Sequence, residues 1–168
     1  MSKVRGDCKG GEALMAASMM GHTAIVKLLL GWPDHPPRAD SMDGLALCWA
    51  AENGHMGVIS LLLKCPRHPV RADTRDGLAV ALAVQNGHIA IVNALLGWHN
   101  HPPRADVRND RLLMIAAKNG RNAILKMLLD WPIHSPLADS ADGLALVLAV
   151  KMGHLDTVKL LLGMYKCL

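Results

Sequence analysis

The chain repeats itself every 33 residues, and this period constrains its fold more than any other feature of the sequence. A glycine followed by histidine, or once by arginine, marks each unit at Gly21, Gly54, Gly87, Gly120 and Gly153. An aspartate keeps the same spacing at Asp7, Asp40, Asp73, Asp106 and Asp139. A fixed period of this length is typical of a solenoid, in which each unit packs on its neighbours. We therefore read residues 1–168 as one domain with units 7–39, 40–72, 73–105, 106–138 and an incomplete 139–168.

Within a unit, apolar residues follow a helical period on both sides of the glycine turn. The stretch DGLALCWAAENGH predicts a short first helix, Leu45–Glu52, and MGVISLLLK predicts a second helix near His55–Lys64. The paired alanines Ala50 and Ala51 are small enough for a neighbouring helix to approach closely. Prolines such as Pro33 end the second helix, because proline cannot continue the backbone hydrogen-bond ladder. The fold class is therefore all-α, a helix–turn–helix repeat solenoid with long proline-containing connecting segments.

Composition limits the compartment and the kind of core. Apolar residues make up 51% of the chain, yet there is no Phe and one Tyr, so Leu, Ala, Val, Ile and ten Met must fill the core. The apolar runs are far shorter than the roughly 18 residues of a membrane-spanning helix. The first residues, MSKVRGDCKGGEAL, lack the apolar segment of a secretory signal, and the four cysteines show no Cys-x-x-Cys pairing. We expect an intracellular protein, most simply a cytoplasmic one, without membrane association.

Histidine and tryptophan recur in and beside the proline segments. One histidine per unit stands at His35, His68, His101 and His134. Stacked helices lie about 8–10 Å apart, whereas all ligands of one zinc ion lie about 2 Å from it, so this ladder predicts no metal site. The tryptophans Trp32, Trp98 and Trp131 end the second helices, where we expect each to seal the core beneath the proline loop.

The sequence contains no recognisable catalytic constellation. It has no Gly-rich phosphate loop, no Gly-x-Ser-x-Gly elbow and no His-Glu-x-x-His motif. The recurring aspartates are expected to head turns or caps, where a carboxylate accepts from free backbone N–H groups. We predict neither an enzyme nor a cofactor, and no small-molecule substrate.

The repeated residues resemble those of the ankyrin repeat family. ENGHMGVISLLL and KMGHLDTVKLLL match the half of the family pattern with Gly-His and a Leu-Leu-Leu run. The family's Thr-Pro-Leu-His tetrad is replaced, for instance by Leu45-Ala46-Leu47-Cys48, so apolar packing must replace its hydrogen bonds. Its Gly-Ala-Asp-x-Asn link is replaced by a proline segment, which leaves either a β-hairpin or an extended loop at that position.

The resemblance implies a protein-binding module or scaffold whose concave face, made of turn tips and first-helix ends, contacts a protein partner. Variation among units at these positions, against a constant core, is what a recognition face requires. Carried over to this chain, the partner-binding positions are Met42, Trp49, Glu52, Asn53, Arg75, Gln85, Asn86, Arg108, Lys118, Asn119, Lys151 and Met152.

Two other functions stay open at this stage. The first is nucleic-acid binding by a basic strip through the middle units, formed by Arg71, Arg75, Arg104, Arg108, Arg111 and Lys118. The second is a purely structural role as a segment of a larger assembly, because terminal units normally carry a polar outer face. Here both ends are apolar, with Met15, Met19 and Met20 at one and Val158, Leu160 and Leu161 at the other.

Overall fold

The computed structural model describes residues 11–33, 36–99, 107–131 and 140–165, and helices are the regular structure within these ranges. The first three pairs are α1 (Glu12–Met19) with α2 (Thr23–Leu30), α3 (Ser41–Glu52) with α4 (Met56–Leu63), and α5 (Thr74–Asn86) with α6 (Ile89–Leu96). The last two pairs are α7 (Val107–Lys118) with α8 (Asn122–Leu129), and α9 (Ser140–Lys151) with α10 (Leu155–Tyr165). No strand occurs in the described ranges, so the described connections are loops rather than β-hairpins.

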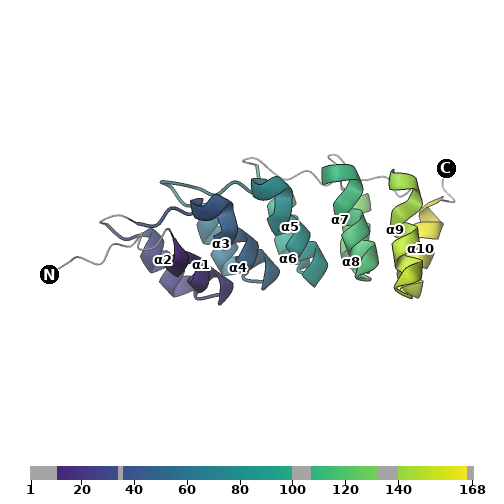
Figure 1. Ribbon diagram of the computed structural model, residues 1–168, viewed down its shortest axis with the longest axis horizontal. Helices are drawn as coiled ribbons and strands as arrows, with labels where there is room; N and C mark the ends of the chain where they lie inside the picture. The colour runs from purple at the N-terminus through teal and green to yellow at the C-terminus, as the bar shows by residue number, and fades with distance from the viewer. Residues whose placement is uncertain (1–10, 34–35, 100–106, 132–139, 166–168) are drawn as a thin grey trace.

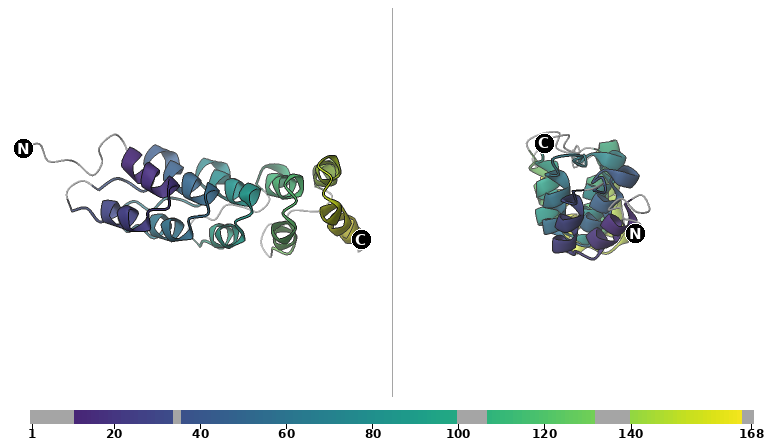
Figure 2. Two further views of the ribbon diagram at one scale, coloured as in Figure 1. Left: turned by 90° about the horizontal axis from the view of Figure 1, so that it is seen from below. Right: turned by 90° about the vertical axis from the view of Figure 1, so that its left-hand side faces the viewer.

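The helical pairs stack along the chain as an elongated array (Figure 1). Each odd-numbered helix packs on the next odd-numbered helix, and each even-numbered helix packs on the next even-numbered one and on its own partner. The array therefore has two layers of helices, which appear as two rows when it is seen from below (Figure 2). This arrangement confirms the all-α repeat solenoid.

The regular part of the first helices begins where the apolar pattern predicts. Helix α3 is assigned from Ser41, but Met42, Asp43 and Gly44 have left-handed backbones with φ of 52°, 56° and 73°. The regular turns therefore cover residues 45–52. Helix α5 has the same tip, with Arg75, Asp76 and Gly77 at φ of 54°, 54° and 73°.

Small side chains hold the odd-numbered helices close together. One alanine per unit lies between these helices: Ala17 is 6% exposed, and the other four are fully buried, namely Ala50, Ala83, Ala116 and Ala149. Leucines and isoleucines of the even-numbered helices, such as Ile59, Leu62 and Leu95, complete the core and are also fully buried. The prediction that alanines let neighbouring helices approach closely, while larger apolar residues fill the core, is confirmed.

The structure corrects two predictions about the connecting segments. Trp98 and Trp131 are half-buried against the core as expected, but Trp32 is 40% exposed and does not seal its unit. The aspartates that precede α3 and α5 make no side-chain cap. Instead, Asp40 and Asp73 each form an ion pair of 2.8 Å with the arginine two residues earlier, because that guanidinium offers two parallel N–H donors.

A hydrogen bond between units repeats at each of the four joins. The imidazole Nε2 of His55 lies 3.0 Å from the carbonyl oxygen of Met19, 36 residues earlier. The same contact joins His88 to Glu52 and His154 to Lys118 at 3.0 Å, and Arg121 donates through Nε to Gln85 at 3.1 Å. Histidine is therefore not required, because Arg121 makes the same contact, but a ring or guanidinium N–H is present at each of these joins.

The glycines of the repeat make room for this donor. A Cβ on Gly21 would lie 2.5 Å from the ring of His55, and one on Gly54 would lie 2.8 Å from the ring of His88. Both glycines also have a positive φ, of 72° and 81°, which other residues rarely adopt. Turn geometry and the join between units therefore require the same residue.

We predict that Ala50→Leu destabilises the fold by about 1–3 kcal/mol, because the larger side chain overpacks the layer of odd-numbered helices. Ala90→Leu on the exposed side of α6 is the control and should change the free energy of unfolding little. Urea unfolding of both variants measures the difference. Equal losses would contradict the assignment of the two environments.

We also predict that His88→Ala costs about 0.5–1.5 kcal/mol by leaving the Glu52 carbonyl without its donor. His88→Arg should retain most of the stability, because Arg121 already makes the equivalent contact one unit later. The exposed His68 supplies the control variant His68→Ala. Thermal unfolding that ranks the arginine variant no better than the alanine variant would refute a hydrogen-bonding role.

Candidate partner-binding face

A row of half-buried apolar side chains runs along the odd-numbered helices. It has one residue per unit at a fixed spacing of 33 residues, and its members are Trp49, Leu82, Ile115 and Leu148. Because consecutive odd-numbered helices pack on each other, these residues follow one another along the array. The row supplies apolar contact area that remains partly open to solvent.

A second row, at the ends of the same helices, is polar and varies from unit to unit. Its first position changes from carboxylate to amide to ammonium, through Glu52, Gln85, Lys118 and Lys151. Glu52 is half-buried and the other three side chains are exposed. Charge therefore changes from acidic to basic along the array while the backbone position stays the same.

The backbone beneath this polar row is fixed in place. Asn53, Asn86 and Asn119 donate their side-chain amides to carbonyls four residues earlier, at 2.9, 3.0 and 2.8 Å. The carbonyls of Glu52, Gln85 and Lys118 accept the hydrogen bonds between units. The three asparagines thus close the helix ends, and the neighbouring Glu, Gln and Lys side chains are left to vary. Such a preorganised surface loses little conformational entropy on binding.

One turn tip carries an exposed apolar residue, and the next tip carries an arginine that bridges the two tips. Met42 is 47% exposed. Arg75 donates to the carbonyl oxygens of Met42 and Asp43 at 3.1 Å each and lies 3.6 Å from the Asp43 carboxylate. Arg75 therefore joins two successive tips and stabilises the left-handed residues of the first. Arg108 belongs to α7, but its side chain lies outside the described residues.

The arginines of the proposed basic strip are largely engaged. Arg71 is paired with Asp73 through two hydrogen bonds, at 2.9 and 2.8 Å, and Arg75 is paired as above. Arg111 is half-buried, Lys118 is exposed, and Arg104 lies outside the described residues. Two of the described cations of the strip, Arg71 and Arg75, are therefore held by carboxylates.

The arginine–aspartate pair also shifts the pKa of its carboxyl group. The hydrogen bond from Arg38 lowers the pKa of Asp40 below its ordinary value. A carboxyl with a lowered pKa stabilises the folded state above its ordinary pKa, and this contribution disappears as the pH falls through the lowered value. The pair therefore contributes at neutral pH and not in strong acid.

A family comparison matches almost the whole chain. The model of ankyrin repeats in three copies covers residues 2–76 and 80–167. The chain belongs to the ankyrin repeat family. A search of the curated proteins gives no match. None of the helices in the described ranges has the length and apolar character that a membrane crossing needs.

Within this ankyrin array, the structure groups the predicted residues differently from the sequence. Trp49 was predicted as a single partner-binding residue, whereas it is one member of the apolar row that Leu82, Ile115 and Leu148 continue. Met19 and Met20 were also missed, although they are 39% and 59% exposed at the phase of Glu52 and Asn53. The 33-residue phase would have identified all five residues. Lys151 and Met152 are exposed as expected.

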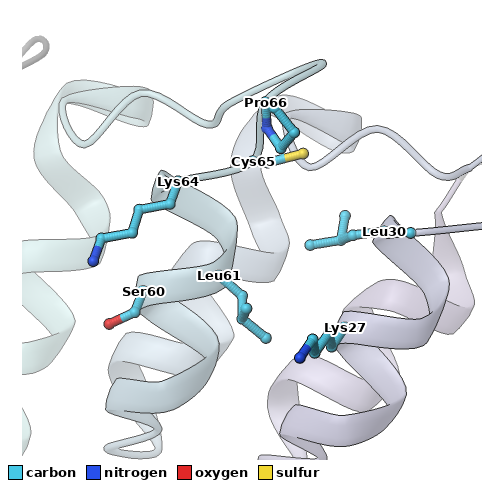
Figure 3. Close-up of a pocket in the computed structure, with 8 residues that line it drawn as sticks. Lys27, Leu30, Ser60, Leu61, Lys64, Cys65 and Pro66 are labelled. Atoms are coloured by element: carbon cyan, nitrogen blue, oxygen red, sulfur yellow. The ribbon is translucent and has the colours of Figure 1, made fainter.

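The second layer of the ankyrin array carries a separate open groove between α2 and α4. Its volume is about 420 Å³, and Lys27, Leu30, Leu61, Lys64 and Cys65 are among its lining residues (Figure 3). The figure shows Lys27 and Leu30 on one helix and Leu61 and Lys64 on the next. The charged side chains that line the groove are Lys27 and Lys64.

The described residues offer little for catalysis. No three His, Cys, Asp or Glu side chains among them approach closely enough to hold a metal ion. Cys48 is buried, and desolvation raises the pKa of its thiol to about 11, so it is far less nucleophilic than an activated cysteine. The ankyrin repeat family is in general non-catalytic.

We predict that iodoacetamide at pH 8 alkylates Cys48 at least about a hundredfold more slowly in the folded chain than in urea, since a two-unit rise in pKa lowers the thiolate fraction that much. Peptide mapping by mass spectrometry reads the rate at this cysteine alone. Stability should also fall above pH 9, because the unfolded thiol ionises before the folded one. Similar alkylation rates in both states would mean that α3 opens locally.

Proposed function

We propose that this ankyrin chain is a non-catalytic interaction module that binds a protein partner on its concave face, along the turn tips and ends of its odd-numbered helices. The observation that carries the proposal is the apolar row beside a polar row that changes from unit to unit on a fixed backbone. Apolar area supplies affinity, and the change from Glu52 to Lys151 supplies a charge pattern that selects a partner.

A protein partner fits the described charges better than nucleic acid does. Binding to a phosphate backbone relies on several free cations in one track. Here Arg71 and Arg75 are held by carboxylates, and the formal net charge is only +4. Base stacking also uses several exposed aromatic rings, whereas Trp49 is the one aromatic member of the apolar row. Nucleic-acid binding stays as the alternative.

We place this function inside the cell, in the cytoplasm, and assign it no cofactor. The two described cysteines, Cys48 and Cys65, are free thiols, which a reducing compartment maintains. The partner is expected to present an acidic patch toward the units that carry Lys118 and Lys151, because both ammonium groups are exposed there.

The test compares two charge reversals of the same size in the same units. Lys118→Glu with Lys151→Glu alters the polar row, and Lys126→Glu with Lys159→Glu alters the exposed side of the even-numbered helices. Each tagged variant is expressed in source cells, and recovered proteins are quantified by mass spectrometry. Partners should be recovered at least about tenfold less with the first variant than with the second, because rim charges mainly set association rate.

Two controls make this result decisive. Both variants should have the same melting temperature as the original chain, since all four lysines are exposed. Labelled single-stranded and duplex nucleic acid is titrated in parallel at physiological salt. If both variants recover the same proteins equally, this face is not the binding face, and tight salt-sensitive nucleic-acid binding without protein partners would favour the alternative.

A further inference from the structure

The groove between α2 and α4 contains a cysteine where the third and fourth units have a tryptophan. Cys65 is among its lining residues, and the 33-residue period places Trp98 and Trp131 at the same position. Both tryptophans are half-buried against the core. A thiol side chain is much smaller than an indole, so the second unit leaves apolar space open at this position. The groove lies between two consecutive units, and its opening does not depend on what precedes or follows them.

The exposure of one leucine per unit follows the same difference. Leu30 precedes Cys65 by 35 residues. Leu63 and Leu96 stand in the same relation to the two tryptophans, and each is 4% exposed. Leu30 is half-buried and lines the groove. This difference is expected if an indole covers the leucine in the later units and the cysteine does not.

The walls of the groove are apolar. Leu30 on α2 and Leu61 on α4 point into the space between the two helices, and Cys65 and Pro66 lie at one end of it (Figure 3). The volume of about 420 Å³ falls within the range of roughly 300–1,000 Å³ that is typical of ligand sites. The groove therefore has room for a ring and offers it aliphatic contacts on two sides.

The charge around the groove is positive. Both of its charged lining residues, Lys27 and Lys64, are exposed. Lys27 extends from α2 toward Leu61, whereas the ammonium group of Lys64 is directed away from the groove (Figure 3). The flexible four-carbon chain of a lysine allows it to turn back toward a bound carboxylate. Arg67, next to Pro66, is exposed as well. A ligand with carboxylates on either side of an apolar group would meet complementary charge here.

We propose that this groove binds an aromatic side chain from an acidic segment of a second protein. The ring takes the place that an indole has in the third and fourth units and packs against Leu30 and Leu61. The acidic residues on either side of the ring meet Lys27 on one wall and Lys64 on the other. Aromatic anchors of this kind supply much of the affinity of a protein interface, and charges at the rim raise the association rate.

An open groove favours a peptide segment over a small molecule. Small ligands are held in cavities that bury most of their surface, whereas this groove is bounded by two helices and leaves one side of its occupant exposed. An aromatic residue of a polypeptide needs only its ring enclosed, because its backbone remains attached to the partner. The groove lies in the layer of even-numbered helices, so this binding is separate from that on the partner-binding face of the odd-numbered helices.

The first measurement titrates the isotope-labelled chain with three acetylated pentapeptides and follows it by two-dimensional NMR. The peptide Glu-Glu-Trp-Glu-Glu should shift the amide resonances of α2 and α4. Replacing its tryptophan with alanine removes the anchor, and replacing its four glutamates with lysines reverses the charge. Each change should weaken binding at least about tenfold.

The second measurement fills the groove from within the chain. Cys65→Trp restores the side chain of the third and fourth units, so it should keep the melting temperature and abolish peptide binding. Ala90→Trp is the matched control, because it adds the same ring on the exposed side of α6, away from the groove. This variant should bind the peptide like the original chain.

A charge reversal tests the same groove without changing its apolar walls. Lys27→Glu should weaken binding of the acidic peptide roughly fivefold or more. Lys126→Glu reverses the lysine at the same phase in the fourth unit and should leave binding unchanged. Both lysines are exposed, so neither variant should alter the melting temperature. This pair decides the proposal if Cys65→Trp melts earlier than the original chain.

Each outcome decides the proposal. A peptide that shifts no resonance of α2 or α4 overturns it, and so does equal binding of the alanine peptide, which would leave only charge attraction. Binding to Cys65→Trp as tight as to the original chain would place the peptide elsewhere, and equal losses in Lys27→Glu and Lys126→Glu would do the same. Indole acetate is the last probe, and if it binds as tightly as the peptide, the groove is a small-molecule site instead.

Discussion

The hydrogen bond between each unit and the one before it is the constraint on which the rest of the array depends. It fixes the residue after the turn glycine as a donor, and it fixes the glycine itself, because a Cβ there would strike the donor's ring. It also anchors the last carbonyl of each first helix, as at Glu52 and Lys118. Side chains around that carbonyl can then change without moving the backbone, which is how a constant frame presents a variable surface.

Much of this arrangement could be predicted from the sequence, because a contact that recurs in every unit leaves a periodic pattern of residues. The phase predicted the two helices of each unit and the alanines that let neighbouring helices approach closely. The capping role of Asp40 was predicted wrongly, because Arg38 stands two residues earlier and competes for the carboxylate with two charge-assisted donors. The exposure of Trp32 was missed because phase alone does not show how far a side chain is covered.

The candidate site was harder to predict than the fold, because it depends on how much of a side chain remains open. Trp49 and Leu82 occupy one row, yet only the tryptophan attracted attention in the sequence. Arg75 read as a free surface charge, but it bonds the tip of the neighbouring unit. The role of such a residue is set by a neighbour about 33 positions away. The two residues must therefore be considered together, as one contact between units.

The loss of the family's Thr-Pro-Leu-His tetrad concentrates the polar interactions between units in a few contacts. At Leu45-Ala46-Leu47-Cys48, Leu45 is half-buried, the other three are buried, and none of these side chains can form the tetrad's hydrogen bonds. Apolar stacking is non-directional, so the His or Arg donor and the Arg75 bridge must set the register of one unit on the next. The join between units is therefore specified by a small number of directional contacts, and the apolar core supplies the rest of its contact area.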